Sequence, residues 1–299
     1  MRKKDGSKRL LPPGAEERHV TTAAGRLRVL HAGVAADDRS PVVLVHGGGS
    51  DSAAISWYRL IGPLAGSREV WALDLPGFGG SIGAEPVGGP REMAAVLAEA
   101  MDRLGVGPAI VFGVSMGGDV ALNLALDHPR RVRGLVLVAP GGLVPIFRNR
   151  AAHFGAWLMA RSPDWLLRPA SRLSNRFART ALRAIVKDIR KLPPEVVEEF
   201  VHEARHPRGG LAYGRYNQAT IGRRGMLNDL SDRVHAIAVS TLILHGEDDP
   251  IVDPEGSRRA AARMPDARLV MVPGCGHWVQ LEAHDRFLSE VSAFLAGSP

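Results

Sequence analysis

Short continuous runs of apolar residues recur along the chain, and between them apolar positions repeat every three or four residues. The continuous runs are typical of strands covered on both faces, and the longer repeat is typical of helices with one buried face. The predicted strands are 41–47, 69–77, 109–115, 134–140, 241–249 and 268–274, and the predicted helices are 91–104, 117–127, 255–263 and 284–296. This alternation predicts the α/β class, with a mostly parallel central sheet and helices on both of its faces.

The chain before the first of these strands carries a different pattern. Apolar and polar residues alternate over 18–33, which predicts a hairpin that turns at Ala23–Gly25. The preceding tail of about 18 residues is basic. It lacks the apolar stretch of a secretory signal, because only Leu10 and Leu11 stand before two prolines. Nowhere does an apolar run reach the length of a membrane span. We therefore expect a cytoplasmic protein.

The alternation of strands and helices is interrupted once, between residues 142 and 228. Nearly a hundred residues there show helix-like spacing and no convincing strand, which is too long for a structureless loop. We expect this segment to form a helical cap over the carboxyl edge of the sheet. The predicted organisation is a first part of the core over 1–141, the cap over 142–228 and a second part of the core over 229–299.

Positive charge is concentrated in the cap. The chain has a net charge of +7, yet residues 142–228 alone hold 16 Lys/Arg and 6 Asp/Glu. Within 165–192 the spacing predicts a helix with a cationic face and an apolar face. The cationic positions are Arg168, Arg172, Arg176, Arg179, Arg183 and Lys187, and the apolar positions are Leu173, Phe177, Leu182, Ile185, Val186 and Ile189. This pattern fits an ordinary solvated face, or a lid that contacts anionic lipid or attracts an acidic substrate. We expect no nucleic-acid partner, because no recognition motif or aromatic stacking platform accompanies the charge.

Composition excludes several other functions. Cys275 is the single cysteine, so disulfide frameworks and multi-cysteine metal sites are ruled out, and we expect a packed thiol. Asp248, Asp249 and Asp253 lack the glycine and bidentate glutamate spacing of a calcium loop. Phosphate-binding and dinucleotide-binding glycine motifs are missing as well. The sequence therefore predicts no metal and no cofactor.

Two serines stand in a Gly-x-Ser-x-Gly pattern, and their surroundings differ. Ser81 has loop-like sequence on both sides, whereas Ser115 stands where a predicted strand ends and a predicted helix begins. A sharp turn at that junction lifts a serine hydroxyl out of the sheet, and the flanking glycines give the turn clearance. The start of the helix also favours developing negative charge. We predict that Ser115 is a nucleophile and that Ser81 is not.

A serine nucleophile needs a base, an orienting acid and donors for the oxyanion, and the chain offers each of them. Acidic residues follow the predicted strand at 241–249, and His277 lies in a glycine-flanked loop after the next strand. The backbone N–H of Met116, directly after the serine, predicts one oxyanion donor, and that of Gly48 a second. We expect His46 and His245 to make structural hydrogen bonds only.

The motifs together resemble those of the capped α/β-hydrolases. The matching segments are HGGG at 46–49, DLPGFGGS at 74–81, GVSMGG at 113–118, HGEDDPIV at 245–252 and GCGHWVQLE at 274–282. The resemblance places the triad acid just before PIV, at Asp249, with Asp248 as the alternative. It implies that Ser115 attacks an acyl carbonyl, that His277 is the general base and that no cofactor takes part. A small-molecule carboxylic ester, thioester or lactone is the first expected substrate class.

Two other functions remain open at this stage. The segment after HGGG and the CGHWVQLE motif are similar to those of enzymes that hydrolyse a carbon–carbon bond in dienoic diketo acids. That resemblance implies Arg205 in the cap and Trp278 as substrate contacts, and we add Gly49 of the glycine loop. Taken by itself, Trp278 fits core packing equally well. The chain differs from that family at Val114, where asparagine is usual. A hydrolase-fold receptor without turnover is the third hypothesis.

Overall fold

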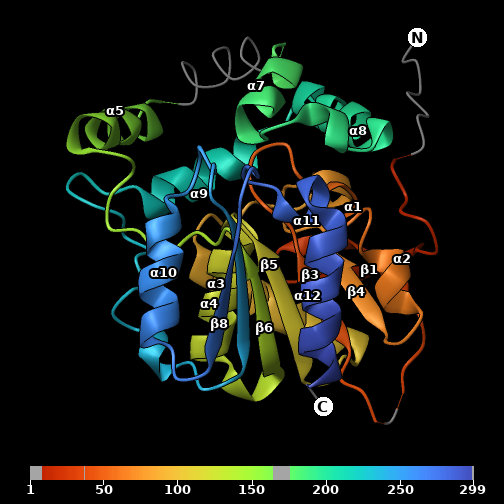
Figure 1. The fold of residues 1–299 in the computed structure, drawn as a ribbon. Coiled ribbons are helices and arrows are strands. Elements are labelled where there is room, and N and C mark those ends of the chain that lie inside the picture. Colours follow the sequence, from red (N-terminus) through yellow and green to blue (C-terminus); the bar gives the residue numbers. More distant parts are fainter. Residues whose placement is uncertain (1–8, 37, 164–175, 298–299) are drawn as a thin grey trace, which may run out of the picture.

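The computed structural model describes residues 9–36, 38–163 and 176–297, and it is built around one eight-stranded sheet (Figure 1). The strands are β1 (Glu16–Thr22), β2 (Gly25–Ala32), β3 (Val42–Val45), β4 (Val70–Leu73), β5 (Ala109–Val114), β6 (Val132–Val138), β7 (Thr241–Gly246) and β8 (Ala267–Val272). Their order is β1-β2-β4-β3-β5-β6-β7-β8. The β1–β2 and β2–β4 pairs are antiparallel, and all other pairs are parallel. The predicted mostly parallel sheet is confirmed.

Strand positions follow the apolar runs. β3, β4, β5 and β7 are buried at every residue, as continuous apolar runs require when helices cover both faces. The predicted runs extend one to three residues past most of these strands, because the chain leaves the ladder there and enters the loops at the carboxyl edge. The predicted hairpin is β1–β2, with Thr22 opposite Gly25.

Helices cover both faces of the sheet. The long helices α3 (Pro90–Leu104), α4 (Met116–Asp127), α10 (Pro254–Arg263) and α12 (His284–Ala296) agree with the sequence pattern, and α1 (Ala53–Ser56), α2 (Ile61–Ala65) and α11 (Val279–Glu282) are additional short ones. Four or five residues are too few to display a helical repeat. α3, α4 and α10 pack into the apolar core on one face, and α1, α2, α11 and α12 into that on the other (Figure 1). No described helix has the length and apolar character needed to cross a bilayer.

The chain between β6 and β7 forms helices that gather over the end where the parallel strands finish (Figure 1). They are α5 (Arg150–Ala160), α7 (Ala178–Ile185), α8 (Pro194–Arg205) and α9 (Leu211–Thr220). The remaining 3₁₀ turns are η1 (Gly79–Ser81), η2 (Pro129–Arg131), η3 (Ile189–Lys191) and η4 (Val234–Ala236). Throughout, we refer to residues 142–228 as the cap and to the rest of the chain as the core.

The predicted cationic helix is wrong at its end. α7 stops at Ile185, because Val186 takes an extended conformation (ψ 150°) and Asp188 then begins η3 by accepting from a backbone N–H. Lys187 therefore lies beyond the helix, where its Nζ is 3.2 Å from an oxygen of Asp248 in the core.

The predicted apolar face of that segment is also incomplete. Phe177 precedes the helix and is 62% exposed, whereas Leu182 is fully buried, because only residues inside the helix follow its repeat. Arg168, Arg172 and Leu173 lie outside the described residues. The contact of this cationic segment with anionic lipid stays a prediction.

Candidate active site

Ser115 occupies a strained turn between β5 and α4. Its φ of 54° and ψ of −119° lie in a backbone region that residues other than glycine rarely adopt. Holding a residue in such a region destabilises the folded state by about 1–3 kcal/mol. The neighbours explain the need for glycine. A Cβ on Gly113 would lie 2.3 Å from the Gly117 carbonyl oxygen, and one on Gly117 would lie 2.3 Å from the Val45 carbonyl oxygen. The turn therefore fits only this spacing of glycines, and it places Ser115 on the wall of a cavity.

The predicted acid and base lie together. Asp249 follows β7 and His277 follows β8, and His277 Nδ1 donates to Asp249 Oδ2 over 2.7 Å. Asp248, the alternative acid, instead points outward to Lys187. Ser115 Oγ has no hydrogen-bond partner among the described residues, and the contact from serine to base is frequently long before substrate binds. The three side chains stand after β5, β7 and β8, at the carboxyl edge where ligands bind in open α/β sheets.

The environment of Asp249 keeps it ionised. Burial would raise the pKa of this carboxyl group, but hydrogen bonds from His245 and His277 outweigh that effect and hold the pKa well below its ordinary value. The second oxygen, Oδ1, accepts from the backbone N–H groups of Ile251 and Val252, at 2.7 and 3.1 Å. The arrangement therefore supplies a fixed, negatively charged partner for His277. His245 was expected to be structural only, and its contact with the acid has no signal in the sequence.

The cap fixes the loop that carries His277. The backbone N–H of His277 donates to the Ile185 carbonyl at the end of α7, 3.1 Å away. Glu282 accepts from the backbone N–H of Lys187 over 2.7 Å, which adds a second link between cap and core. A Cβ on Gly276 would lie 2.8 Å from the Lys187 nitrogen, so this glycine is required by the close approach. The position of His277 therefore depends on both the core and the cap.

The glycine loop after β3 lies beside the nucleophile. Asp51 accepts from the backbone N–H of Gly47 at 2.8 Å, and His46 Nε2 accepts from the N–H of Leu75 at 3.0 Å, as a structural histidine would. Met116 and Gly49 line the cavity with Ser115. Gly48 is covered by a cap residue, because a Cβ there would lie 2.3 Å from the ring of Tyr213. The Gly48 and Met116 N–H groups remain our proposed oxyanion donors.

The cavity over Ser115 has a volume of about 1260 Å³ and lies between core and cap. Among the described residues, its cap wall carries three arginines and no acidic residue: Arg148, Arg208 and Arg215. Arg208 lies 3.8 Å from the exposed Glu85, and Arg215 donates to Gln218. An anionic group in the cavity therefore meets cations on its cap side.

Two of the predicted substrate contacts lie elsewhere. Arg205 is exposed and does not line the cavity, because the turn of α8 that buries Ala204 directs the next residue outward. Trp278 is 3% exposed and packs edge-on against Phe200 of α8, with ring centroids 5.8 Å apart. It joins cap to core and does not line the cavity, whereas Gly49 does.

A buried acid that has no cationic partner among the described residues stands in the first turn of α4. Asp119, one turn after Ser115, accepts from the Tyr216 hydroxyl of α9 at 2.8 Å, and from the side-chain amides of Asn123 and Asn228. Burial raises its pKa to about 7, although these three hydrogen bonds act in the opposite direction. Tyr216 and Asn228 line the cavity, so this acid connects the nucleophile helix to the cap.

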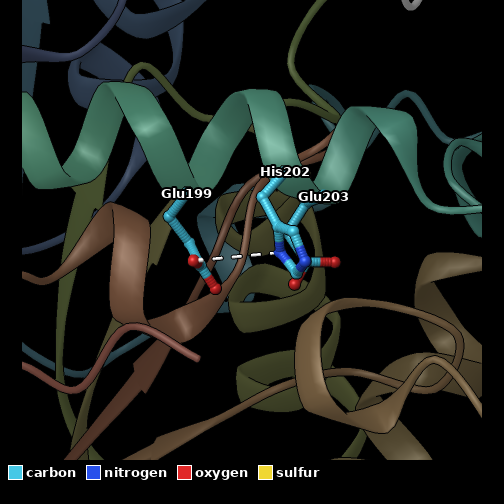
Figure 2. Close-up of side chains that lie close together, drawn as sticks. All are labelled: Glu199, His202 and Glu203. Carbon is cyan, nitrogen blue, oxygen red and sulfur yellow. Dashed lines mark ion pairs between the residues drawn. The ribbon is translucent and has the colours of Figure 1, made fainter. Parts of the chain in front are cut away.

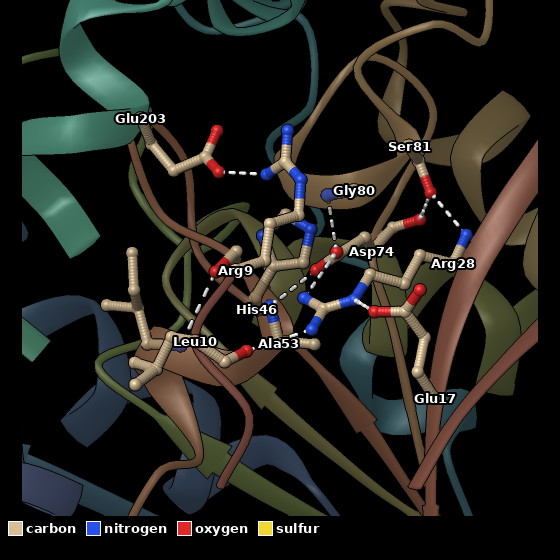
Figure 3. A network of polar contacts seen from close by, with 12 residues as sticks. Arg9, Leu10, Glu17, Arg28, His46, Ala53, Asp74, Gly80, Ser81 and Glu203 are labelled. Carbon is tan, nitrogen blue, oxygen red and sulfur yellow. Dashed lines mark hydrogen bonds and ion pairs between the residues drawn. The ribbon is translucent and has the colours of Figure 1, made fainter. Parts of the chain in front are cut away.

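One cluster of potential metal ligands lies on α8. Figure 2 shows Glu199, His202 and Glu203 grouped on one side of the helix. Figure 3 shows that the guanidinium of Arg9 already contacts Glu203. The positive charge of Arg9 takes the place that a cation would need, so these residues do not fit a metal site. The cluster instead attaches the N-terminal segment to the cap.

The second Gly-x-Ser-x-Gly segment serves the core. Ser81 is fully buried. Its Oγ donates to the Asp74 carbonyl at 2.7 Å and accepts from the backbone N–H of Arg28 at 2.8 Å (Figure 3). The Arg28 guanidinium, 2% exposed, lies 3.4 Å from the Asp74 carboxylate. Ser81 is outside the cavity lining, in agreement with its exclusion as nucleophile.

Known proteins show the same architecture. A family model described as alpha/beta hydrolase fold matches residues 40–284. The chain is 31% identical over 274 residues to a 2-hydroxy-6-oxo-6-phenylhexa-2,4-dienoate hydrolase of Burkholderia cepacia, covering 85% of this chain and 87% of the relative. It is 32% identical over 269 residues to a 2-hydroxymuconate semialdehyde hydrolase of Pseudomonas putida, covering 86% and 87%. The structure of an esterase from Thermogutta terrifontis is 25% identical, with a TM-score of 0.74 and coverage of 94% and 98%. The chain belongs to the alpha/beta hydrolase fold family and is an enzyme of that family.

Proposed function

We propose that this enzyme hydrolyses a carbon–carbon bond in a dienoic diketo acid, with Ser115, His277 and Asp249 as its triad. This substrate class was the alternative at the sequence level, where esters, thioesters or lactones came first. The observation that carries the proposal is the cavity over Ser115, whose cap wall, as far as the structure describes the cap, holds three arginines and no acid. Arginines in the wall attract the carboxylate of a monoanionic or dianionic dienoate, whereas a neutral ester has no charge for them to bind.

The chemistry of such a cleavage explains why a cationic wall matters. His277 removes the proton of Ser115, and Oγ attacks the ketone carbon at position 6 of the dienoate, with the oxyanion held by backbone N–H groups. Before this attack the dienol must become a diketone: the 2-hydroxyl loses its proton, carbon 5 gains one, and the remaining double bond lies between carbons 3 and 4. The oxyanion then collapses to the acyl ester of Ser115 as the bond between carbons 5 and 6 breaks, and the electron pair delocalises through carbons 3 and 4 onto the 2-keto oxygen, beside the carboxylate, before it is protonated. Water, activated by His277, then releases the acyl group from Ser115 as a carboxylic acid. Arginines near the carboxylate end favour the charge that develops there.

The relatives support this choice of substrate. Two hydrolases whose names specify a 2-hydroxy-6-oxodienoate or a 2-hydroxymuconate semialdehyde match over more than four fifths of the chain. The difference from that family at Val114 does not argue against this substrate class, because of where Val114 lies. Val114 is fully buried at the end of β5, packs in the core and is not part of the cavity wall. Its side chain therefore does not face the substrate.

Ester hydrolysis is the second candidate. The outer cap wall of the cavity includes Ile146, Phe147, Ala156 and Met159, which suit an apolar acyl or alkyl group. The structurally similar esterase from Thermogutta terrifontis fits this reading. A serine attacking a ketone and a serine attacking an ester use the same base and the same oxyanion donors, so the triad alone does not separate the two reactions.

Direct comparison of substrates tests the proposal. Initial rates are measured with 2-hydroxy-6-oxo-6-phenylhexa-2,4-dienoate, through loss of its conjugated absorbance, and with p-nitrophenyl esters of increasing chain length. We expect kcat/KM for the dienoate to exceed that for every ester, and Ser115→Ala to abolish both. Turnover of esters alone would replace the C–C proposal by the ester one. Binding of the dienoate without turnover of any compound would favour the receptor hypothesis.

The role of the cap charge has its own matched control. Arg148 lines the cavity and has no ion-pair partner in the described part of the chain, whereas Arg150 is exposed at the start of α5, outside the cavity. Loss of a charged hydrogen bond in Arg148→Gln raises KM for the dienoate about tenfold, and KM for esters stays unchanged. Arg150→Gln alters neither value. Equal effects of the two variants would show that general charge, and not a contact in the cavity, is responsible.

A further inference from the structure

The triad acid faces two histidines through one oxygen. Asp249 Oδ2 accepts from His277 Nδ1 at 2.7 Å and from His245 Nε2 at 3.1 Å. His245 stands near the end of β7 and is fully buried. The backbone N–H groups of the following loop already occupy Oδ1 of the same carboxylate. His245 thus competes with His277 for the oxygen on which the triad depends.

The contacts of His245 determine its tautomer. Its Nε2 lies 3.1 Å from Asp249 Oδ2 and 3.2 Å from the Val252 carbonyl oxygen, and an ionised carboxylate and a carbonyl can only accept. Nε2 must therefore carry a proton. Nδ1 lies 2.7 Å from Ser257 Oγ in α10, and the hydroxyl donates to it when the ring is neutral. The ring is fixed at both nitrogens, so its donor to Asp249 is preorganised.

We propose that His245 is a positioning residue that sets the basicity of His277 by sharing the Oδ2 atom of Asp249. The inference rests on the proposed triad, but it does not depend on which bond the enzyme cleaves. A second N–H donor withdraws negative charge from Oδ2 and so weakens its stabilisation of the His277 imidazolium.

Other titratable groups surround the Asp249 carboxylate. They are Asp248 and Asp253 in the loop after β7, Cys275 and Glu282 around the His277 loop, and Lys187 and Lys191 in the cap. Burial raises the pKa of Cys275 to about 12, so the thiol stays protonated near neutral pH. Asp248 is paired with Lys187 in a partly exposed position. Among the described residues, the donors to Asp249 Oδ2 are therefore His245 and His277.

The test compares two substitutions of His245 that differ only in the donor. In His245→Leu the N–H is lost, whereas in His245→Gln the side-chain amide nitrogen extends to the place of Nε2 and restores it. The pH profile of kcat/KM is recorded with the best substrate found, dienoate or ester. In His245→Leu we expect the acidic limb to move up by about 0.5–1 pH unit, and kcat to fall about 10–100-fold because Asp249 loses its fixed orientation. His245→Gln returns the limb toward the wild-type position.

The result that overturns the proposal is a folded His245→Leu enzyme whose acidic limb coincides with that of the wild type. Unchanged activity in Ser115→Ala would instead refute the triad itself, so the two failures are distinguishable. A measurement on the wild-type protein guards against a variant that does not fold. The ¹⁵N NMR shifts of labelled histidines must show His245 protonated at Nε2 and unprotonated at Nδ1 at neutral pH. The opposite tautomer would overturn the proposal without any substitution.

Discussion

Two segments of this chain carry the same Gly-x-Ser-x-Gly pattern, and they lie in opposite environments. Ser81 is buried, and its hydroxyl bonds to two backbone groups of the core. Ser115 has a positive φ, lines a cavity, and has no hydrogen-bond partner for its hydroxyl in the described part of the protein. The hydroxyl that the fold satisfies is structural, and the one that the fold leaves open is available for chemistry.

Each of these serines also has a buried aspartate nearby, and the two acids differ in the same way. Asp74 beside Ser81 is close to the Arg28 guanidinium, so its charge is compensated. Asp119 beside Ser115 accepts only from neutral donors, and burial raises its pKa. The acid near Ser81 is paired with a cation, whereas the acid near Ser115 is buried among neutral donors and lies beside a strained turn. Backbone strain and a buried acid among neutral donors thus occur together at the proposed active site.

The largest expected contrast is between alanine substitutions at the two serines. Ser115→Ala lowers kcat by at least about 10⁴-fold, because the nucleophile is lost, while the free energy of unfolding stays near that of the wild type. Ser81→Ala leaves kcat unchanged and lowers the free energy of unfolding by about 2–4 kcal/mol, since two buried backbone groups lose their partner. Rates on the best substrate and urea unfolding give both values. Loss of activity in a folded Ser81→Ala enzyme would contradict the distinction.

A smaller contrast concerns the pH dependence of stability at Asp119. The pKa of this acid is about 7 in the folded protein against an ordinary value of 3.8, so the unfolded state loses its proton first as pH rises. The contribution of Asp119 to the free energy of unfolding is therefore fully present below about pH 4. It decreases by about 4 kcal/mol as the pH rises through about 7.

The matched variant isolates this contribution from those of other groups. The side chain in Asp119→Asn cannot ionise. Between pH 4 and 8, the free energy of unfolding measured in urea should therefore decrease by about 4 kcal/mol less in this variant than in the wild type. An identical pH dependence in wild type and Asp119→Asn would show that the acid ionises in the folded protein without cost.

Much of the fold and of the proposed triad was accessible from the sequence for a simple reason. Parallel strands bring their carboxyl ends to one edge, so the order of Ser115, Asp249 and His277 after three strands predicts their grouping. Apolar runs and helical repeats likewise identify the long elements of the core. These signals are local in the chain, and the sheet converts them directly into positions.

The cap was less predictable because its contacts are tertiary. Arg205 and Trp278 fit a family pattern, yet the direction of α8 turns one outward and places the other against Phe200. Lys187 continued a helical repeat that Val186 ends. The second donor to Asp249 was also missed, since a histidine four residues before an acid has no distinctive spacing when a strand end separates them. Each error arose where packing between segments overrides the local pattern.

The smallest expected effect tests the strain at Ser115 itself. Glycine adopts a φ of 54° freely, so Ser115→Gly relieves about 1–3 kcal/mol of strain and loses part of it to the greater freedom of glycine in the unfolded chain. We expect a net gain of about 1 kcal/mol in the free energy of unfolding relative to Ser115→Ala, since both lack the hydroxyl. Ser81→Gly should be less stable than Ser81→Ala, because no strain is relieved there. If glycine destabilises both positions equally, the turn at Ser115 is not strained, and its opening toward the cavity would be a matter of steric clearance alone.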